Sequence, residues 1–368
     1  MNVQHKSLRL TVLAGAVALM TTLAACGSST PPVASSSTPP AASSSTPPAA
    51  TGIDVGTGTI TPKNTDHIAY LVQATKTYSY TVAQAKAAVD AGAAAGVTVD
   101  VYYDELKPET ELANFQLAFS GGKYGGIIMQ PGNAQLCKTI AADSVKQQVL
   151  VEIVGNALCD DGTGIGESLW APGTIAYMGG QNGVDGITTV LDAAAKTHTG
   201  PQKVMLAMGI KGHPSTVAWE AAWKLWQPKH PDWTLAAETF SDFTTPGAFT
   251  SVQNSLQGNP DVSVIFSLYI DVTAGVVKAV EAAGLKDKIA VFENGGGSKV
   301  SLQLLAAGKI AGSLPVYPAS LGADGVKTMI AAFKGTQPPK FIPGDGNPDA
   351  AKVGVITKAT AGSFTALW

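Results

Sequence analysis

Charged residues are scarce in this sequence of 368 residues, making up 14% of the total, and the formal net charge is only −3. No block of lysine or arginine occurs, so the sequence lacks the basic surface on which nucleic-acid binding depends. The five histidines, at positions 5, 67, 198, 213 and 230, do not have the spacing of metal ligands. We therefore expect no nucleic-acid partner and no metal or other cofactor.

Sequence motifs of the common enzyme classes are also missing. There is no Gly-x-x-x-x-Gly-Lys-Ser/Thr loop, which binds phosphate, and no Gly-x-Ser-x-Gly turn that presents a nucleophilic serine. Residues 345–349 begin like a calcium-binding loop, but Ala350 and Ile356 replace the glycine and glutamate that such a loop requires. We therefore expect a protein without catalytic function.

The N-terminus has the pattern of a secretory leader. His5, Lys6 and Arg9 precede an apolar stretch at 10–20 that is too short for a typical membrane-spanning helix. Residues 23–26, with the sequence LAAC, resemble the bacterial lipobox. This resemblance implies a signal peptide over residues 1–26, cleavage before Cys26 and lipid attachment to the Cys26 sulfur. We therefore expect an extracytoplasmic protein anchored to the bacterial cell membrane.

Residues 27–63 are rich in serine, threonine and proline, and Ser-Thr-Pro-Pro recurs at 29–32, 37–40 and 45–48. Proline favours extended conformations, and serine and alanine offer no apolar face to bury. The segment is therefore predicted to be a semi-rigid linker between the membrane anchor and a folded part that begins near residue 64.

Cysteine is rare, and besides Cys26 only Cys137 and Cys159 occur. Two remaining thiols outside the cytoplasm are usually paired. Cys137 is predicted to lie in the first turn of a helix and Cys159 just after the next strand, so both should lie near the same edge of a parallel sheet. We expect these two residues to form a disulfide.

An alternation of apolar strands and amphipathic helices begins at residue 68. Residues 68–72 are a short apolar run, residues 82–93 carry small apolar side chains at helical spacing, and residues 97–101 alternate like a second strand. This βαβ pattern requires a parallel sheet. Further strands are expected at 125–130, 149–154, 174–178, 203–208, 234–240, 263–268, 289–292 and 311–316, with helices between them. The sequence thus predicts two doubly wound α/β lobes with a small-ligand site between them, at the carboxyl ends of the strands.

Several segments resemble the periplasmic binding proteins of the ribose-binding type (periplasmic binding protein type 1), which are the solute receptors of ABC importers. The resemblance rests on residues 111–116 (ELANFQ), 126–131 (GIIMQP), 208–212 (MGIKG), 259–262 (NPDV), 275–279, 314–318 and 321–326. It implies two Rossmann-like lobes joined by a hinge of three chain crossings, near Gly179, near Val316 and around Pro343. Residues 64–179 with about 317–343 then form the N-terminal lobe, and residues 180–316 with about 344–368 form the C-terminal lobe.

The family's ligand-binding positions fall on residues of both lobes. Carried over one by one, they are Ser79, Tyr80, Gly155, Asn156, Trp219, Phe243, Tyr269, Glu293 or Asn294, and Val316, and Tyr78 and Tyr317 add further rings nearby. Sugar receptors of this type have an Asp-Arg pair where this chain has Gly155 and Asn156, and an arginine where it has Trp219. Rings thus replace groups that hydrogen-bond to sugar hydroxyls, and rings suit the apolar face of a sugar, an aromatic ligand or an organic cation.

Some of these residues have structural alternatives. Trp219 shares one helical face with Trp223 and Trp226, a spacing that is equally typical of a packed core. Gln130 stands at a strand end, where its side chain can serve either a ligand or the turn. His213 precedes a proline, and a surface turn is a more typical place for it than the cleft.

The resemblance implies a lipid-anchored, monomeric receptor that captures a sugar or another small organic ligand and delivers it to an ABC permease. Two alternatives remain open at this point: a surface sensor that signals ligand binding to a membrane kinase or chemoreceptor, and a hydrolase on the same fold. A related family of transcription repressors shares the two lobes, but the leader and lipobox argue against DNA as the partner.

Overall fold

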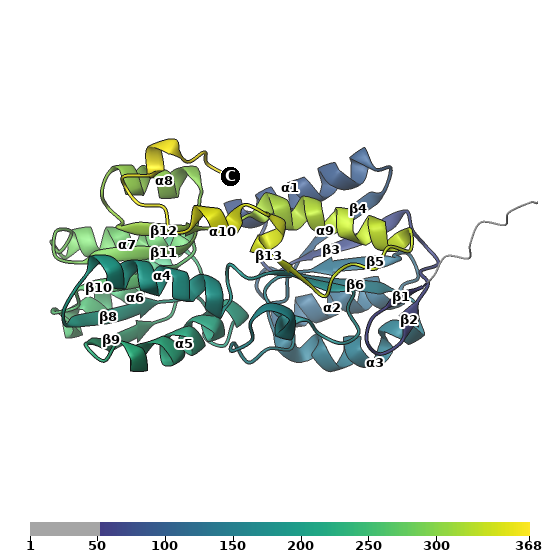
Figure 1. Ribbon diagram of the computed structural model, residues 1–368, viewed down its shortest axis with the longest axis horizontal. Coiled ribbons are helices and arrows are strands. Elements are labelled where there is room, and N and C mark those ends of the chain that lie inside the picture. The colour runs from purple at the N-terminus through teal and green to yellow at the C-terminus, as the bar shows by residue number, and fades with distance from the viewer. Residues whose placement is uncertain (1–51) are drawn as a thin grey trace, which may run out of the picture. The chain divides into compact units, whose positions relative to one another are not determined.

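The computed structural model describes residues 52–368 (Figure 1). The predicted signal peptide, the lipidation site Cys26 and most of the predicted linker lie outside the described residues. Within residues 52–368, no helix is both long enough and apolar enough to cross a membrane.

Strands and helices alternate along the chain and fall into two groups. The first group contains β3 (His67–Val72), α1 (Ser79–Ala94), β4 (Thr98–Tyr103), α2 (Pro108–Ser120), β5 (Gly126–Met129), η1 (Ala134–Leu136), α3 (Cys137–Gln147), β6 (Leu150–Gly155), η2 (Gly166–Leu169), β7 (Ala176–Gly179), α9 (Pro318–Phe333), β13 (Phe341–Pro343) and η4 (Gly344–Gly346). The second group contains α4 (Val184–Thr197), β8 (Gln202–Ala207), α5 (Pro214–Trp226), η3 (Gln227–Lys229), β9 (Trp233–Thr239), α6 (Thr245–Gly258), β10 (Val264–Leu268), α7 (Ile270–Ala282), β11 (Ala290–Gly296), α8 (Lys299–Ala306), β12 (Gly312–Pro315) and η5 (Ala361–Ser363). The short helix α10 (Ala350–Val353) contacts η4.

Each group is built around one parallel β-sheet (Figure 1). The sheet of the first lobe has six strands in the order β13-β7-β6-β5-β3-β4, and the sheet of the second lobe has five in the order β12-β11-β10-β8-β9. All neighbouring strands in both sheets run parallel. The predicted fold class, two doubly wound parallel α/β lobes, is confirmed.

The first sheet is covered on both faces, as the apolar run at its centre predicts. Along β3, Ile68, Tyr70 and Val72 pack into one core with residues of α1 and α9. Ala69 and Leu71 pack into a separate core with residues of α2 and α3 on the opposite face. Figure 1 shows α1 and α9 side by side over the sheet, although more than 200 residues separate them in the sequence.

The prediction that the linker extends to residue 63 is wrong in its last part. A β-hairpin forms there from β1 (Ile53–Asp54) and β2 (Thr59–Ile60). Ile53, Val55 and Ile60 are at most 1% exposed and belong to the core of the first lobe. The spacing of these three apolar side chains places them on one side of the hairpin. The free energy gained by burying them outweighs the entropy lost when the flexible glycines between them become ordered.

The chain passes between the lobes after β7, after β12 and once more near its C-terminal end. The second passage lies between Pro315 and Pro318, and α9 then packs against α1 of the first lobe. The third passage lies between Gly346 and Ile356, because η4 still packs against α9 and β7 whereas Ile356 pairs with Ser313 of the second lobe. Residues 344–346 therefore belong to the first lobe, and not to the second as expected from the sequence.

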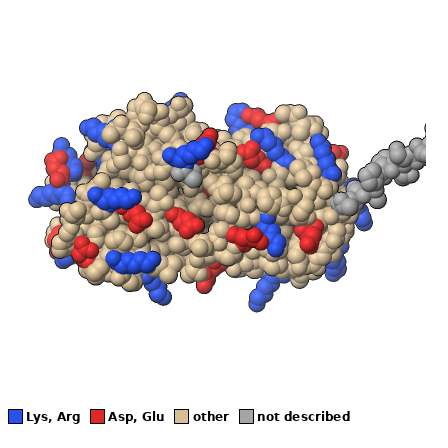
Figure 2. All heavy atoms as spheres, viewed as in Figure 1, with Lys and Arg blue, Asp and Glu red and all other residues tan. Residues whose placement is uncertain are grey.

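The expected disulfide between Cys137 and Cys159 is present, with the two Cα atoms 5.4 Å apart. It joins the first residue of α3 to the loop that follows β6. Both positions lie at the carboxyl edge of the first sheet, as their places in the βαβ pattern predict. Lysine and acidic side chains are scattered over the face shown in Figure 2, and no basic patch gathers there.

Candidate functional site

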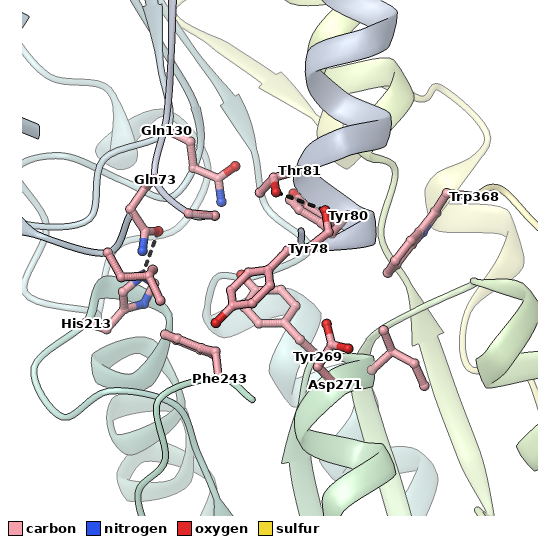
Figure 3. Close-up of a pocket in the computed structure, with 13 residues that line it drawn as sticks. Gln73, Tyr78, Tyr80, Thr81, Gln130, His213, Phe243, Tyr269, Asp271 and Trp368 are labelled. Carbon is pink, nitrogen blue, oxygen red and sulfur yellow. Dashed lines mark hydrogen bonds between the residues drawn. The ribbon is translucent and has the colours of Figure 1, made fainter. Parts of the chain in front are cut away.

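A cavity lies between the two lobes and takes its lining from both (Figure 3). The first lobe contributes Gln73, Ala74, Tyr78, Tyr80, Thr81, Leu106 and Gln130, the second contributes His213, Phe243, Tyr269, Ile270 and Asp271, and Trp368 comes from the C-terminal segment. Most of these residues are apolar or aromatic, with a small number of polar groups among them. This is the usual composition of a small-molecule site.

The lining residues come together because they follow the carboxyl ends of parallel strands. Gln73 comes directly after β3 and Gln130 directly after β5 in the first lobe. In the second lobe Tyr269 comes directly after β10, Phe243 follows β9, and His213 follows β8. The carboxyl ends of strands in an open α/β sheet form the usual binding edge. Here the binding edges of two sheets face each other.

Two of the rings are held by unusual backbone conformations. Phe243 has φ of 62° and Tyr269 has φ of 64°. In this region the backbone of any residue other than glycine is strained. Two glycines make room for these rings. A Cβ on Gly209 would lie 1.9 Å from the Phe243 ring, and a Cβ on Gly295 would lie 2.4 Å from the Tyr269 ring. The surrounding structure thus forces both rings toward the cavity.

The rings of the two lobes contact one another across the cavity. The ring centroids of Tyr80 and Tyr269 are 5.8 Å apart, and those of Phe243 and Tyr269 are 5.9 Å apart. Trp368 packs edge-on against Tyr80 at 5.8 Å, and His213 packs edge-on against Phe243 at 4.8 Å. These distances are in the range of favourable aromatic pairs. The cavity therefore has an almost continuous aromatic wall.

His213 forms the main polar contact between the lobes. Its Nδ1 accepts hydrogen bonds from the backbone N–H and the hydroxyl of Ser215, which leaves the proton on Nε2. Nε2 donates to Oε1 of Gln73 in the other lobe at 2.7 Å. Burial lowers the pKa of His213 to about 3, so the ring is neutral at physiological pH. The same Gln73 oxygen also accepts from Asn156 Nδ2 at 3.4 Å.

Several buried polar atoms at the cavity have no hydrogen-bond partner within the described part of the chain. They are the hydroxyls of Tyr80 and Tyr269, Oε1 of Gln130 and Nε1 of Trp368. A buried polar atom without a partner is costly, at about 1–3 kcal/mol for each group. These atoms are therefore available to hydrogen-bond with a ligand or with water.

Four of the residues predicted from the sequence to bind ligand line this cavity: Tyr78, Tyr80, Phe243 and Tyr269. Asn156 lines a second, smaller cavity between the lobes together with Gly155, Asn182 and Ser215. Its side chain bonds to Gln73 and to the carbonyl of Pro131, which links the two cavities.

The other predicted residues lie elsewhere. Trp219 is fully buried in the core of the second lobe, where it packs against Phe266 at 5.6 Å, so the expectation that it lines the cleft is wrong. Ser79 is exposed at the start of α1. Val316 and Tyr317 are buried where the chain passes from β12 to α9.

Glu293 and Asn294 are both fully buried in β11. Glu293 accepts a hydrogen bond from the Ser313 hydroxyl, and burial raises the pKa of its carboxyl. Asn294 donates from Nδ2 to the carbonyl of Gln181 at 3.2 Å, next to the first chain passage. Both residues thus serve internal contacts and do not line the main cavity.

Several lining residues were not predicted from the sequence. Gln73, Leu106 and Asp271 each lie within three residues of a strand's carboxyl end, a signal that could have found them. His213 is 6% exposed and lines the cavity, so the expectation of a surface turn is wrong. Trp368 reaches the cavity from a segment far from any strand end, and no local pattern marks it.

A family model described as "Periplasmic binding protein domain" matches residues 68–337. The chain belongs to this family. The family and the similar structures are solute-binding proteins and not enzymes, which agrees with the expectation of no catalytic function. The D-allose-binding periplasmic protein of Escherichia coli (strain K12) is 30% identical over 115 residues, or 31% of this chain and 36% of that protein. The matched stretch thus spans little more than a third of this relative's length.

Solved structures of solute-binding proteins share the fold. The myo-inositol-binding protein of Caulobacter, bound to myo-inositol, has a TM-score of 0.70 and 18% identity, covering 84% of this chain and 99% of that one. A carbohydrate transporter solute-binding protein from Agrobacterium radiobacter, in complex with D-arabinose, has a TM-score of 0.66 and 20% identity. The match covers 80% of this chain and 94% of that one. At these identities the likeness establishes the fold and not the ligand.

Proposed function

We propose that this protein is an extracytoplasmic receptor that captures a small organic solute between its lobes and delivers it to an ABC permease. The observation that supports this proposal best is the cavity whose lining comes from the carboxyl ends of the strands of both lobes. A ligand held there contacts both lobes at once. Its binding therefore favours the closed arrangement over an open one.

Two hydrogen bonds join the lobes at the cavity itself. Tyr78 donates from its hydroxyl to the carbonyl of Asp242 at 3.0 Å, and His213 donates to Gln73 at 2.7 Å. Each bond contributes only about 1 kcal/mol. Contacts of this strength leave the closed state sensitive to the additional contacts of a ligand. A permease that recognises the closed state then receives loaded receptors preferentially.

The remaining parts of the proposal come from the sequence. Lipid on Cys26 would hold the receptor at the membrane, and the Ser/Thr/Pro-rich segment would place the lobes within reach of a permease. The similar proteins bind D-allose, myo-inositol and D-arabinose, so sugars and polyols are the first ligands to test. Replacing Cys26 by serine should abolish incorporation of labelled palmitate and release the protein from membranes.

Thermal unfolding of the full chain, purified in mild detergent, tests ligand capture. D-Allose, D-arabinose and myo-inositol are added one at a time, together with a broader set of amines and aromatic acids. A ligand present at 100 times its dissociation constant stabilises the folded state by about 2.7 kcal/mol, which raises the melting temperature by a few degrees. The Phe243→Ala variant should lose that response, because it removes one wall of the cavity.

Delivery is tested by adding the receptor to an ABC permease from the same organism. Its ATP hydrolysis in proteoliposomes should rise only when the receptor and its ligand are both present. Ligand binding without any stimulation of ATP hydrolysis would contradict delivery and would favour a sensor. A folded receptor that binds none of the compounds would contradict solute capture itself.

A further inference from the structure

The cavity is lined by acid and not by base. Asp271 is among the lining residues, and no lysine or arginine is. Residues 52–368 contain no arginine at all. Arginine is the side chain best suited to hold carboxylate or phosphate groups, through paired hydrogen bonds. The lining therefore disfavours an anionic ligand.

Asp271 has no compensating charge. It is the second residue of α7 and is partly buried beside the Tyr269 ring (Figure 3). It forms none of the ion pairs found among the described residues. Burial raises the pKa of its carboxyl above the usual value. A bound cation would provide the missing charge.

Tyr78 also lines the cavity, and carboxylates lie near its hydroxyl. Burial raises the pKa of its hydroxyl to about 12, and the nearby carboxylates of Asp242, Asp271 and Glu105 act in the same direction. The phenolate is destabilised where negative charge gathers, and a cation is stabilised there. The electrostatic potential at this end of the cavity therefore attracts positive charge.

A further carboxyl group influences the rings from another side. Asp345 is fully buried, and its Oδ1 has no hydrogen-bond partner among the described residues. Burial raises the pKa of Asp345 to about 7. Burial is the largest cause that raises the pKa of Tyr80, and the charge of Asp345 is the next largest. The same charge also raises the pKa of Tyr269. Both rings thus lie within the electrostatic influence of a second carboxyl group.

The aromatic wall supplies the second element of a cation site. The rings of Tyr80 and Tyr269 lie 5.8 Å apart, and Tyr80 is only 8% exposed, with its hydroxyl unpaired. Aromatic faces attract cations, most strongly where water is excluded. We propose that the solute is a compact organic cation, an amine or ammonium compound, whose nitrogen binds between these rings and Asp271. This inference rests on the proposed function and narrows its ligand class.

Asp271 also has a local structural role that must be separated from ligand binding. A carboxylate in the first turn of a helix is favoured by the helix dipole. Asp185 provides a matched control, because it is the second residue of α4 in the same lobe, is exposed and does not line the cavity. A change to asparagine at either position removes the same contribution to a helix end, but only the change at Asp271 affects the cavity.

Isothermal titration calorimetry with three pairs of compounds tests the inference on the full chain. Each pair has nearly one shape with and without a positive charge: choline and 3,3-dimethylbutan-1-ol, tyramine and 4-propylphenol, and D-glucosamine and D-glucose. In at least one pair we expect the charged member to bind about 30-fold more tightly than its neutral partner. Asp271→Asn should weaken binding of that cation about tenfold or more, whereas Asp185→Asn should leave it unchanged.

The outcomes separate the inference from the proposed function. Binding of a neutral sugar or polyol without any preference for a charged partner overturns the inference and leaves the receptor function intact. Equal effects of Asp271→Asn and Asp185→Asn on cation binding also overturn it, because they would reflect the helix ends alone. Failure of the folded protein to bind any of the six compounds overturns the inference, and failure to bind the sugar and polyol panel as well counts against the proposed function.

Discussion

His213 of the second lobe donates a hydrogen bond from Nε2 to Oε1 of Gln73 in the first lobe, over 2.7 Å. This bond needs a proton on Nε2, and the neutral imidazole carries its proton there because Nδ1 accepts the backbone N–H of Ser215 at the start of α5. Protonation of Nδ1 would give it an N–H that faces the backbone N–H of Ser215, so two hydrogen-bond donors would point at each other. The contact between the lobes is therefore coupled to the protonation of one buried side chain.

Acid should weaken this contact and reduce the stability that His213 contributes. The pKa of His213 falls from its ordinary 6.5 to about 3 on burial, so the unfolded chain binds more protons at this residue between these values. The contribution of His213 to stability must then decrease as the pH falls below 6.5, by about 1.4 kcal/mol between pH 7.5 and 5.5. Chemical denaturation of the wild type and of a variant without His213, at both pH values, measures this contribution.

The variant His213→Asn isolates this contribution. His213 is the N-cap of α5, a position that asparagine favours, and asparagine does not titrate. The variant should therefore lack the part of the pH dependence that His213 causes. Asp104 and Glu111 lie nearby, and burial raises the pKa of each to about 7, which gives a pH dependence of the opposite sign. Both remain in the variant and cancel in the comparison. Equal pH dependence in the two proteins would exclude the coupling.

Backbone strain at Tyr269 should appear in a pair of substitutions. Tyr269 has φ of 64° and ψ of 154°, a conformation that glycine adopts readily and alanine does not. We expect Tyr269→Gly to be more stable than Tyr269→Ala by about 1–2 kcal/mol. Both variants lose the same ring, so the difference in their free energies of unfolding reports the strain.

Tyr80 provides a control at which the glycine variant should be the less stable of the two. It lies within α1, where glycine is about 1 kcal/mol less favourable than alanine. Tyr80→Gly should therefore be less stable than Tyr80→Ala. If glycine were the less stable choice at Tyr269 too, the strained conformation would not exist in solution.

Trp219 and Phe243 should behave differently when each is replaced by alanine. Trp219 is 0% exposed and packs against Phe266 within the second lobe, so Trp219→Ala should lower the free energy of unfolding by about 3–5 kcal/mol. The affinity of the remaining folded molecules for ligand should not change. Phe243→Ala should instead reduce affinity. Loss of ligand affinity in a stable Trp219→Ala protein would show that Trp219 is part of the binding site.

The strands and lobes were predictable because buried parallel strands have a simple signature. The run at 68–72 is apolar without alternation, since both faces of β3 are covered, and the same holds for β5. β6 is buried throughout and is apolar except for Glu152. The hairpin at β1 and β2 was missed because two-residue strands among glycines and threonines have almost no local signal. Its burial depends on a partner surface that is distant in the sequence.

The site was only partly predictable for a related reason. The resemblance to the family pointed to Tyr80, Phe243 and Tyr269 as cleft residues, and all three line the cavity. The same resemblance pointed to Trp219 as a cleft residue, whereas its helical spacing was typical of a packed core, and the structure places it in the core. Trp368 reaches Tyr80 only through tertiary structure, which no local pattern records.

A buried carboxyl group in the first lobe should limit stability at neutral pH. Glu152 in β6 is 0% exposed, and neither of its side-chain oxygens has a hydrogen-bond partner among the described residues. Burial raises the pKa of Glu152 well above its ordinary value of 4.5, so the folded state keeps a proton that the unfolded chain loses. The contribution of Glu152 to stability must therefore fall as the pH rises above 4.5.

The variant Glu152→Gln should remove this loss. Glutamine has nearly the same shape and cannot ionise, so its advantage over the wild type should grow as the pH rises from 5 to 7. Denaturation at these two pH values measures the change, with the exposed Glu109→Gln in α2 as the control that should show no such trend. A constant difference between variant and wild type at both pH values would mean that Glu152 is ionised in the fold. An ionised carboxylate at a site without hydrogen bonds would in turn require a compensating positive charge, and no lysine among the described residues forms an ion pair with it.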